Sequence, residues 1–413
     1  MTSDAVEEES GSAPVRPSVA VRRRRALLFA TAAVAVVAAT VFAVVRSGDE
    51  QPPPDVPLDA WAPYWTIQDS LDVLADHGDL LRQVSPFGYQ VTGASTIALD
   101  PNASVDEMAS LVDAARDAGA EVVPSIRDAT PAGAMAEILA DPVTRRAHVG
   151  AIVDFVEEGS FDGVDVNYEQ FAFADARASW AETRPNWVTF VRELAAALGD
   201  HTLVVSVPPV YDAGTGPDSG YWVYDYAAIA PLVDYVRVMA YDHSFDQPGP
   251  IAPLQWVGRV VDGAIDASGT PDKLVLGVPL YGYNWPVSTT GTCPEGEDVG
   301  RTTVTARNVD ELIELRSVTP VYDELTGEWS FTYTLELDDG STSCRQLREV
   351  HYVDASGARA RVDIARRADL GGASLWALGY DDEDVWVELA ELARPATVDG
   401  PGASSTVAPV QND

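Results

Sequence analysis

Phe161-Asp-Gly-Val-Asp-Val-Asn-Tyr-Glu169 is the stretch of sequence that decides the fold. Side chains alternate along a strand, so Asp165, Asn167 and Glu169 are predicted to share one face, about 6.6 Å apart in succession. The apolar residues between them suit packing against outer helices. A polar row pointing into a barrel needs a reason, because unpaired buried carboxyl groups are costly. An active site at the carboxyl end of the strand supplies that reason. A hydrogen-bonded structural network or an exposed strand is the alternative.

Short β-branched and aromatic runs like this one recur eight times along the chain. They are Ala60–Trp65, Val84–Val91, Glu121–Ile126, Gly163–Glu169, Leu203–Pro208, Tyr235–Tyr241, Leu274–Leu280 and Ala373–Leu378. Helical patterns separate most of them: Ser104–Gly119, in which Ser104 and Glu107 have capping-box spacing, then Pro142–Glu158, Trp187–Leu198 and Leu254–Ala267. Such alternation predicts an α/β protein with a parallel sheet, closed or doubly wound. The count of eight favours a (β/α)8 TIM barrel over residues 58–394.

The interval between the seventh and eighth predicted strands is too long for one connection. Residues 286–350 contain both cysteines and an alternating stretch, Trp329–Leu337, which predicts a small β-rich insertion. Such an insertion could wall a substrate groove or be purely structural. Cys293 and Cys344 are predicted to form a disulfide bond that ties its two ends together, as cysteine pairs readily do in exported proteins.

The N-terminus predicts export. Four arginines, residues 22–25, precede an uncharged apolar run from Ala26 to Val45, which as a helix spans roughly 30 Å, the thickness of a bilayer core. Positive charge stays cytoplasmic, so residues 1–25 are predicted as a cytoplasmic tail and 26–45 as a single-pass transmembrane anchor with the barrel outside the cell membrane. A cleaved signal peptide and a secreted protein are the alternative. Residues 46–57 are predicted as a Pro-rich linker and 395–413 as a disordered tail.

Composition narrows the partners. The net charge of −37 argues against nucleic acid and anionic lipid as partners, whereas a neutral polysaccharide is compatible. Nothing in the sequence argues for an interface, so a monomer is expected. The histidines show no metal-ligand spacing, and no metal site is predicted; they are His77, His148, His201, His243 and His351.

The decisive stretch resembles the signature of glycoside hydrolase family 18, in which three aspartates lead to a glutamate. Asp162, Asp165 and Glu169 match, and Asn167 departs. Further matching segments follow in the family's order: Val238-Met-Ala-Tyr-Asp242, Lys273–Gly282 and Gly371-Gly-Ala-Ser-Leu-Trp376. Ser85–Tyr89 and Leu375–Gly379 are closer to the bacterial spore-germination, cortex-lytic members. The family's third-strand Ser-x-Gly-Gly is missing, and Pro124-Ser-Ile-Arg127 stands there instead.

The resemblance implies a retaining, substrate-assisted glycosidase without a cofactor, one of the exceptions to the two-carboxylate scheme. Glu169 would be the acid and then the base, acting on chitin-type or peptidoglycan polymers with an N-acetylated sugar at the cleavage point. The catalytic set is Glu169, Asn167, Asp165 and Tyr241, with Tyr241 orienting the acetamido group. The substrate-binding set is Asp162, Met239, Asp242, Trp376, Trp65, Tyr64 and Tyr89. Within it, Trp376 is implied as the floor under the sugar, and Trp65 or Tyr64 as a stacking ring.

Asn167 replaces the aspartate that orients the acetamido group and offsets positive charge in the family. Losing one preorganised electrostatic interaction commonly costs about 10²–10³ in rate. Three outcomes follow: a slow hydrolase, an enzyme whose Asn167 works as a neutral partner, or a membrane-tethered glycan-binding protein without turnover. Arg237 is predicted on the same inward face as Met239 and Tyr241. There it would either keep Asp165 ionised or pair structurally at the lower end of the strand.

Overall fold

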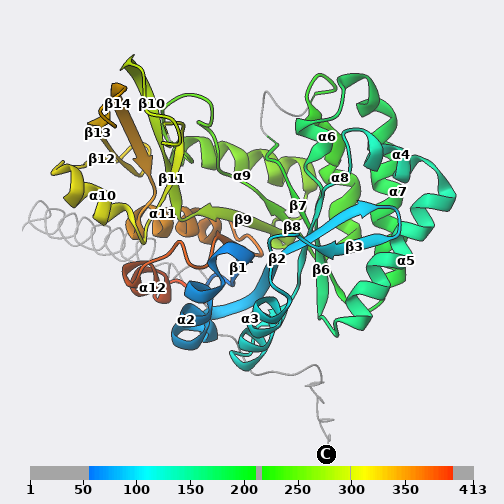
Figure 1. Cartoon of the computed structure of the whole chain (residues 1–413). Helices are drawn as coiled ribbons and strands as arrows, with labels where there is room; N and C mark the ends of the chain where they lie inside the picture. The colour runs from blue at the N-terminus through cyan, green and yellow to red at the C-terminus, as the bar shows by residue number, and fades with distance from the viewer. Residues whose placement is uncertain (1–54, 211–215, 298, 394–413) are drawn as a thin grey trace, which may run out of the picture. The chain divides into compact units, whose positions relative to one another are not determined.

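The computed structural model describes residues 55–210, 216–297 and 299–393 (Figure 1). Residues 1–54, the apolar run 26–45 among them, lie outside this range, as does the predicted tail 395–413. Within the described ranges, no helix has both the length and the apolar character needed to cross a membrane.

Eight parallel strands form a closed barrel, as predicted. Its order is β1 (Leu58–Pro63), β15 (Gly372–Trp376), β9 (Leu274–Pro279), β8 (Tyr235–Val238), β7 (Thr202–Val207), β6 (Gly163–Asn167), β5 (Ser125–Asp128) and β2 (Leu81–Gly93). Parallel pairing of β1 with β2 closes the ring. The short strands β3 (Thr96–Leu99) and β4 (Glu121–Val122) also pair with β2.

Several strand predictions need correction in their bounds. The fourth and sixth predicted runs end as strands at Asn167 and Val238. The third predicted run is divided into β4 and β5 around Pro124, which has no N–H for the sheet. The first ends at Pro63, so Tyr64–Thr66 forms a 3-10 turn and Trp65 lies beyond the strand.

Helices surround the barrel and cover the outward face of its strands (Figure 1). They are α2 (Ile67–His77), α3 (Val105–Asp117), α4 (Ala134–Ala140), α5 (Pro142–Glu158), α6 (Gln170–Phe173), α7 (Trp180–Leu198), α8 (Tyr226–Ile229), α9 (Leu254–Ser268), α11 (Ala355–Arg367) and α12 (Glu383–Ala390). The predicted cap of α3 is present, since Ser104 accepts a hydrogen bond from the Glu107 amide. Helix α7 begins seven residues before Trp187 and contains Pro185, a residue type that usually interrupts helices and obscures their pattern.

The insertion between β9 and β15 is larger than predicted. It is an antiparallel sheet in the order β11 (Thr302–Thr305), β10 (Tyr281–Gly291), β14 (Ser343–Tyr352), β13 (Glu328–Asp338) and β12 (Val321–Asp323), with helix α10 (Val309–Arg316). It therefore begins at 281 instead of 286, and contains a helix that the alternating pattern did not predict. The Cys293–Cys344 disulfide is confirmed. It joins the far ends of β10 and β14, not the ends at which the insertion leaves the barrel, because Gly291 pairs with Cys344.

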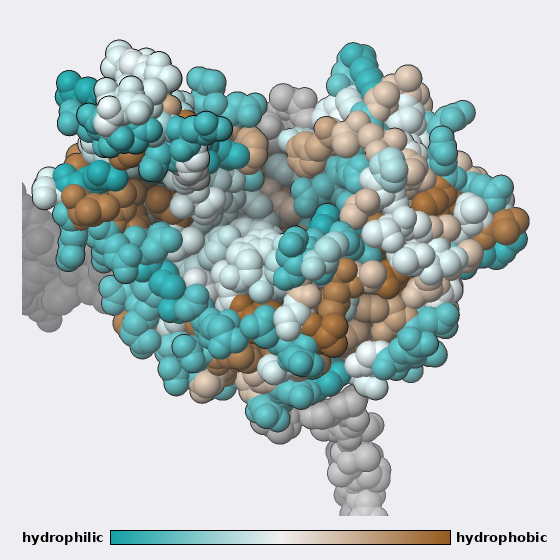
Figure 2. Space-filling model, viewed as in Figure 1, coloured by the Kyte–Doolittle hydropathy of each residue, from teal (hydrophilic) through white to brown (hydrophobic). Residues whose placement is uncertain are grey.

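The space-filling view shows a mostly hydrophilic face that is hollowed between the insertion and the helices across the barrel (Figure 2). The barrel interior is itself polar at one level: Asp59, Gln83, Ser85, Asp165, Ser206 and Arg237 are all buried. Branched apolar residues usually fill such barrels. Here a polar layer lies directly below the carboxyl ends of the strands.

Candidate active site

A cavity of about 230 Å³ opens at the carboxyl ends of the barrel strands, where the insertion meets the barrel. Its walls come from β6, β8, β10, β11, β15 and the segments that follow them: Asn167, Glu169, Met239, Tyr241, Asp242, Tyr281, Tyr283, Thr303, Trp376 and Tyr380. Six of these residues were predicted from the sequence, and the structure brings them together. Their roles in catalysis and binding stay predictions.

The turn after β6 holds Glu169. The strand ends at Asn167, so Glu169 lies two residues beyond it, directly before α6, instead of inside the predicted strand. Tyr168 points the opposite way into the helical layer, where its hydroxyl is 2.8 Å from His148 Nε2. The Tyr224 hydroxyl donates to the Tyr168 carbonyl at 2.7 Å. With Tyr168 fully buried between these contacts, the turn presents Glu169 to the cavity in one orientation.

The pKa of Glu169 is raised to about 7, mainly by desolvation. A hydrogen bond from Asn167 lowers this pKa, and the nearby charges of Asp242 and Asp165 raise it. A carboxyl group with this pKa is half protonated at neutral pH, so it can both give and take a proton there. Because the pKa of Glu169 is raised in the folded protein, its contribution to the free energy of unfolding is largest at low pH. It is complete below the pKa of an unfolded glutamate and is lost as the pH rises through about 7.

Asp165 lies beneath the cavity in a polar network, and both of its carboxylate oxygens accept hydrogen bonds. Trp61 Nε1 donates to its Oδ2 at 3.0 Å, and the Ser206 hydroxyl donates to its Oδ1 at 2.7 Å. Arg237 Nη1 lies 3.4 Å from the same Oδ2, and both side chains are fully buried. Arg237 is therefore on the inward face, as predicted, and next to Asp165.

The guanidinium of Arg237 also forms hydrogen bonds with the polar residues below Asp165. Its Nη1 donates to Ser85 Oγ at 2.6 Å, and its Nη2 donates to Gln83 and lies 3.5 Å from Asp59. Arg82 completes the network with an ion pair to Asp59 at 2.7 Å. Two buried carboxylates thus face two guanidinium groups. This balance keeps Asp165 in place as an acceptor beneath Asn167 and Glu169.

Asp242 follows β8 with a left-handed backbone (φ 57°), a conformation that aspartate tolerates better than most residues. Its Oδ1 accepts hydrogen bonds from the Tyr281 hydroxyl and, at 2.9 Å, from the Tyr283 hydroxyl. Burial raises the pKa of Asp242, while these two bonds and the charge of Arg301 lower it. Gly277 permits this close packing. A Cβ there would lie 2.8 Å from the Val238 carbonyl oxygen and 3.0 Å from the Tyr241 ring.

Aromatic rings form the floor and one rim of the cavity. Trp376 packs edge-on against Trp61 and Phe87, with ring centroids 5.6 and 5.1 Å apart. At the rim, Trp65 is 47% exposed and its Nε1 donates to the Tyr380 hydroxyl at 3.0 Å. Apolar ring faces beside hydrogen-bonding groups suit a sugar, whose CH faces and hydroxyls need both.

Three predicted binding residues lie elsewhere. Asp162 precedes β6 at the opposite end of the barrel, where its Oδ2 accepts the Val122 amide at 2.8 Å. This bond joins neighbouring strands, so the structure gives Asp162 a local structural contact in place of the predicted sugar contact. Tyr89 packs outward against Phe155 and Phe161, and Tyr64 packs edge-on against Trp65 without lining the cavity.

Sequence reasoning missed Tyr281, Tyr283, Thr303 and Tyr380. The first two lie on alternate positions of one strand, a pattern visible in Tyr281-Gly-Tyr283, but the predicted insertion began only after them. Thr303 and Tyr380 reach the cavity by tertiary packing, for which the sequence carries no local signal. Among the described residues, no cluster of three His, Cys, Asp or Glu side chains could hold a metal ion.

Comparison with known proteins finds a family model that matches most of the chain. The family described as "Glycosyl hydrolases family 18" matches residues 66–381. One relative, the uncharacterized glycosylase YvbX of Bacillus subtilis (strain 168), is 22% identical over 253 residues. The match covers 60% of this chain and 66% of YvbX, just under two thirds of that protein's length.

Solved structures show the same fold. The spore cortex-lytic enzyme SleL of Bacillus cereus superposes with a TM-score of 0.68 at 19% identity, covering 83% of this chain and 75% of that one. A chitinase from Chromobacterium violaceum ATCC 12472 superposes with a TM-score of 0.67 at 21% identity, covering 81% and 98%.

Proposed function

Because the chain belongs to family 18 of the glycosyl hydrolases, we propose that it cleaves N-acetylhexosamine glycans with retention, using the substrate's own acetamido group as nucleophile. One observation carries the proposal. Of the three carboxyl groups at the site, Asp165 and Asp242 each accept hydrogen bonds from at least two donors, and Glu169 has a pKa raised to about 7. A two-carboxylate glycosidase needs a second, available carboxylate to attack or to activate water. The acetamido oxygen takes that place here.

The reaction has two steps. Glu169 donates its proton to the glycosidic oxygen while the acetamido carbonyl oxygen attacks the anomeric carbon, so the leaving sugar departs as an alcohol and an oxazolinium ion forms. Glu169, now a carboxylate, takes a proton from water as the water oxygen attacks the same carbon and the acetamido group is restored. Two inversions give net retention.

Asn167 acts as the neutral partner of this reaction. Its amide donates to Glu169, and its Oδ1 is buried with no hydrogen-bond partner among the described residues. An unpaired buried acceptor is costly unless a ligand fills it. The substrate's acetamido N–H is the matching donor, and it lies beside the oxygen that attacks. The charge that an aspartate would have contributed is missing, which slows the reaction without preventing it.

Substrate chemistry provides the test. Full-length protein should release reducing ends from N-acetylated chitin oligomers or purified peptidoglycan. De-N-acetylated oligomers of equal length should be cleaved at least about 10³-fold more slowly, because the positioned intramolecular nucleophile is gone. Equal cleavage of both oligomers would show that the nucleophile belongs to the protein or to water.

A parent protein that releases no product would be interpreted by its binding of glycan. If it binds glycan without releasing product, and Asn167→Asp restores release, the protein is a glycan-binding member that has lost turnover. If neither variant binds nor cleaves, the proposed substrate class is wrong.

We also propose that the barrel works outside the cytoplasm, tethered by residues 26–45. The Cys293–Cys344 disulfide supports this location, since structural disulfides persist in oxidising compartments. Protease added to intact cells should digest the barrel. Digestion only after the membrane is permeabilised would place the barrel inside.

A further inference from the structure

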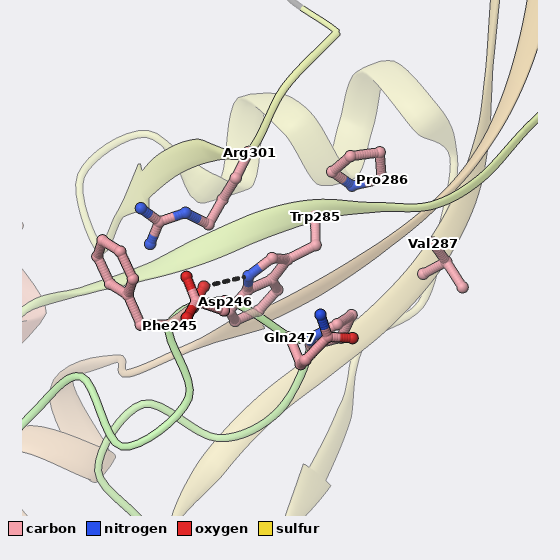
Figure 3. Close-up of a pocket in the computed structure, with 8 residues that line it drawn as sticks. Phe245, Asp246, Gln247, Trp285, Pro286, Val287 and Arg301 are labelled. Carbon is pink, nitrogen blue, oxygen red and sulfur yellow. Dashed lines mark hydrogen bonds between the residues drawn. The ribbon is translucent and has the colours of Figure 1, made fainter.

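A second pocket, of about 290 Å³, lies between the loop after β8 and strand β10 (Figure 3). Arg301, Phe245 and Asp246 line one part of it, and Trp285, Pro286 and Gln247 line another. Trp285 Nε1 donates to the Phe245 carbonyl at 2.9 Å and fixes the loop after β8 against β10. Tyr283 links the two spaces, because it lines the catalytic cavity and packs edge-on against Phe245.

Arg301 is held in this pocket by aromatic stacking. Its guanidinium carbon lies 3.5 Å from the centroid of the Phe245 ring and 4.0 Å from that of Tyr283. These contacts fix the plane of the guanidinium but use none of its N–H donors. Its Nη1 is buried and has no hydrogen-bond partner in the part of the chain that the structure describes.

Arg301 differs from the majority of the described arginines in having no ion pair with another described residue. With 64 acidic and 27 basic residues, carboxylates are abundant, and most of the described arginines form ion pairs, for example Arg82, Arg145 and Arg361. Arg301 forms none within the described residues, although Asp246 lines the same pocket. A rigid guanidinium with free donors is suited to bidentate recognition of a carboxylate.

We propose that this pocket binds the carboxylate of an acidic sugar adjacent to the N-acetylhexosamine being cleaved, with Arg301 as its ligand. The inference rests on the proposed function and names the substrate class: a glycan that alternates N-acetylhexosamine with a sugar bearing a carboxylate on a lactyl ether, as in peptidoglycan. Chitin has no such group. Tyr283 contacts both Arg301 and Asp242, and the proposal places one glycan chain across both spaces.

Asp246 provides a second test, in which the expected change in binding has the opposite direction. Its exposed carboxylate lines the same pocket and opposes an anionic ligand without neutralising Arg301 by an ion pair. Removal of the Asp246 charge should therefore strengthen binding of the acidic sugar, whereas removal of the Arg301 charge should weaken it. A pocket that recognised only neutral hydroxyl groups would respond to neither change in this charge-dependent way.

Binding by full-length protein carrying Glu169→Gln tests the proposal without turnover. The probe is a peptide-free peptidoglycan oligosaccharide with free lactyl carboxylates, and its control is the same oligosaccharide with each carboxylate reduced to an alcohol. Calorimetry should give about tenfold to hundredfold tighter binding of the carboxylate form, the range expected for charge-assisted hydrogen bonds. Adding Arg301→Gln should abolish this preference while leaving binding of the reduced form within about twofold. Peptide-bearing oligosaccharide, in which the lactyl carboxyl is an amide, should bind like the reduced form.

Each other outcome overturns the inference. Equal binding of the carboxylate and reduced forms by the parent would do so, as would an equal loss for both when Arg301 is changed. Preference for peptide-bearing material would assign the pocket to a stem-peptide carboxylate. Asp246→Asn, an exposed substitution that leaves the packing intact, should tighten binding of the carboxylate form alone by about twofold to tenfold. Absence of product release by the parent would contradict the proposed function and leave this binding result standing.

Discussion

Glu169→Gln should lower kcat/KM on N-acetylated glycans by about 10²–10⁴-fold, the range that a positioned general acid or base contributes. Glutamine fills nearly the same volume and accepts the hydrogen bond from Asn167, so the shape of the cavity is retained. It cannot protonate the glycosidic oxygen, nor can it take the proton from water in the second step. The loss should fall on kcat, with substrate binding little changed.

Glu157→Gln is the matched control, because Glu157 is an exposed glutamate on α5 at a distance from the cavity. Its kcat/KM should stay within about twofold of the parent value. A parent-like rate for Glu169→Gln would remove Glu169 from the chemistry, and with it the proposed mechanism.

The pH dependence of kcat/KM tests the role of Glu169 independently. As the acid of the first step, Glu169 must be protonated, and its pKa is about 7. The kcat/KM of the parent should therefore fall about tenfold per pH unit above that value and be flat just below it. An Asn167→Ala protein loses the hydrogen bond that lowers this pKa, so its alkaline limb should move to higher pH. A limb that stays in place would mean that another group sets it.

Arg237→Met should destabilise the protein by about 3–5 kcal/mol, the usual cost of removing one partner from a buried charge network. Methionine fills part of the volume, but it leaves the buried Asp165 without its ion pair and the buried Asp59 with Arg82 as its remaining guanidinium partner. The uncompensated buried charge that remains destabilises the folded state. The free energy of unfolding from urea titration measures the loss.

Arg345→Met is the appropriate comparison. Arg345 pairs with Glu336 on the surface of the insertion, where both side chains are largely exposed. Such pairs contribute about 0–1 kcal/mol. If the two substitutions lower the free energy of unfolding equally, the charge of Arg237 does not stabilise Asp165 and Asp59. Arg237 then contributes only by filling volume in the barrel.

The sequence predicted the barrel because each strand carries its own evidence. Val164 and Val166 face the helices, and Asp165 faces the barrel interior. This alternation can be recognised in the sequence of the strand itself, without knowing which strands lie beside it. The bounds were weaker wherever a proline lies inside an element. Pro124 divides a strand, and Pro185 hides the first two turns of α7.

The site was predictable only in part, for a related reason. Glu169, Tyr241 and Trp376 stand in contiguous motifs that follow strands, so their meeting at the carboxyl ends follows from topology. Asp162 also belongs to such a motif, but it lies one strand length away from the cavity. Its hydrogen bond with the Val122 amide could not be predicted from the motif, because Val122 is distant in the sequence. Tyr380 and Thr303 approach the cavity from distant segments, and only the packed structure brings them there.

Strand β10 has a consequence for how this protein can diversify. Tyr281 and Tyr283 hold Asp242, and the same strand continues past a register shift near Pro286 to the disulfide-tied far end of the insertion. The near half cannot vary freely, because Tyr281 and Tyr283 bind Asp242 and a Cβ on Gly282 would lie 1.9 Å from the His351 carbonyl oxygen. The far half, beyond Pro286, contacts neither Glu169 nor Asp242. The length of this far half is therefore not constrained by the hydrogen bonds that hold Asp242.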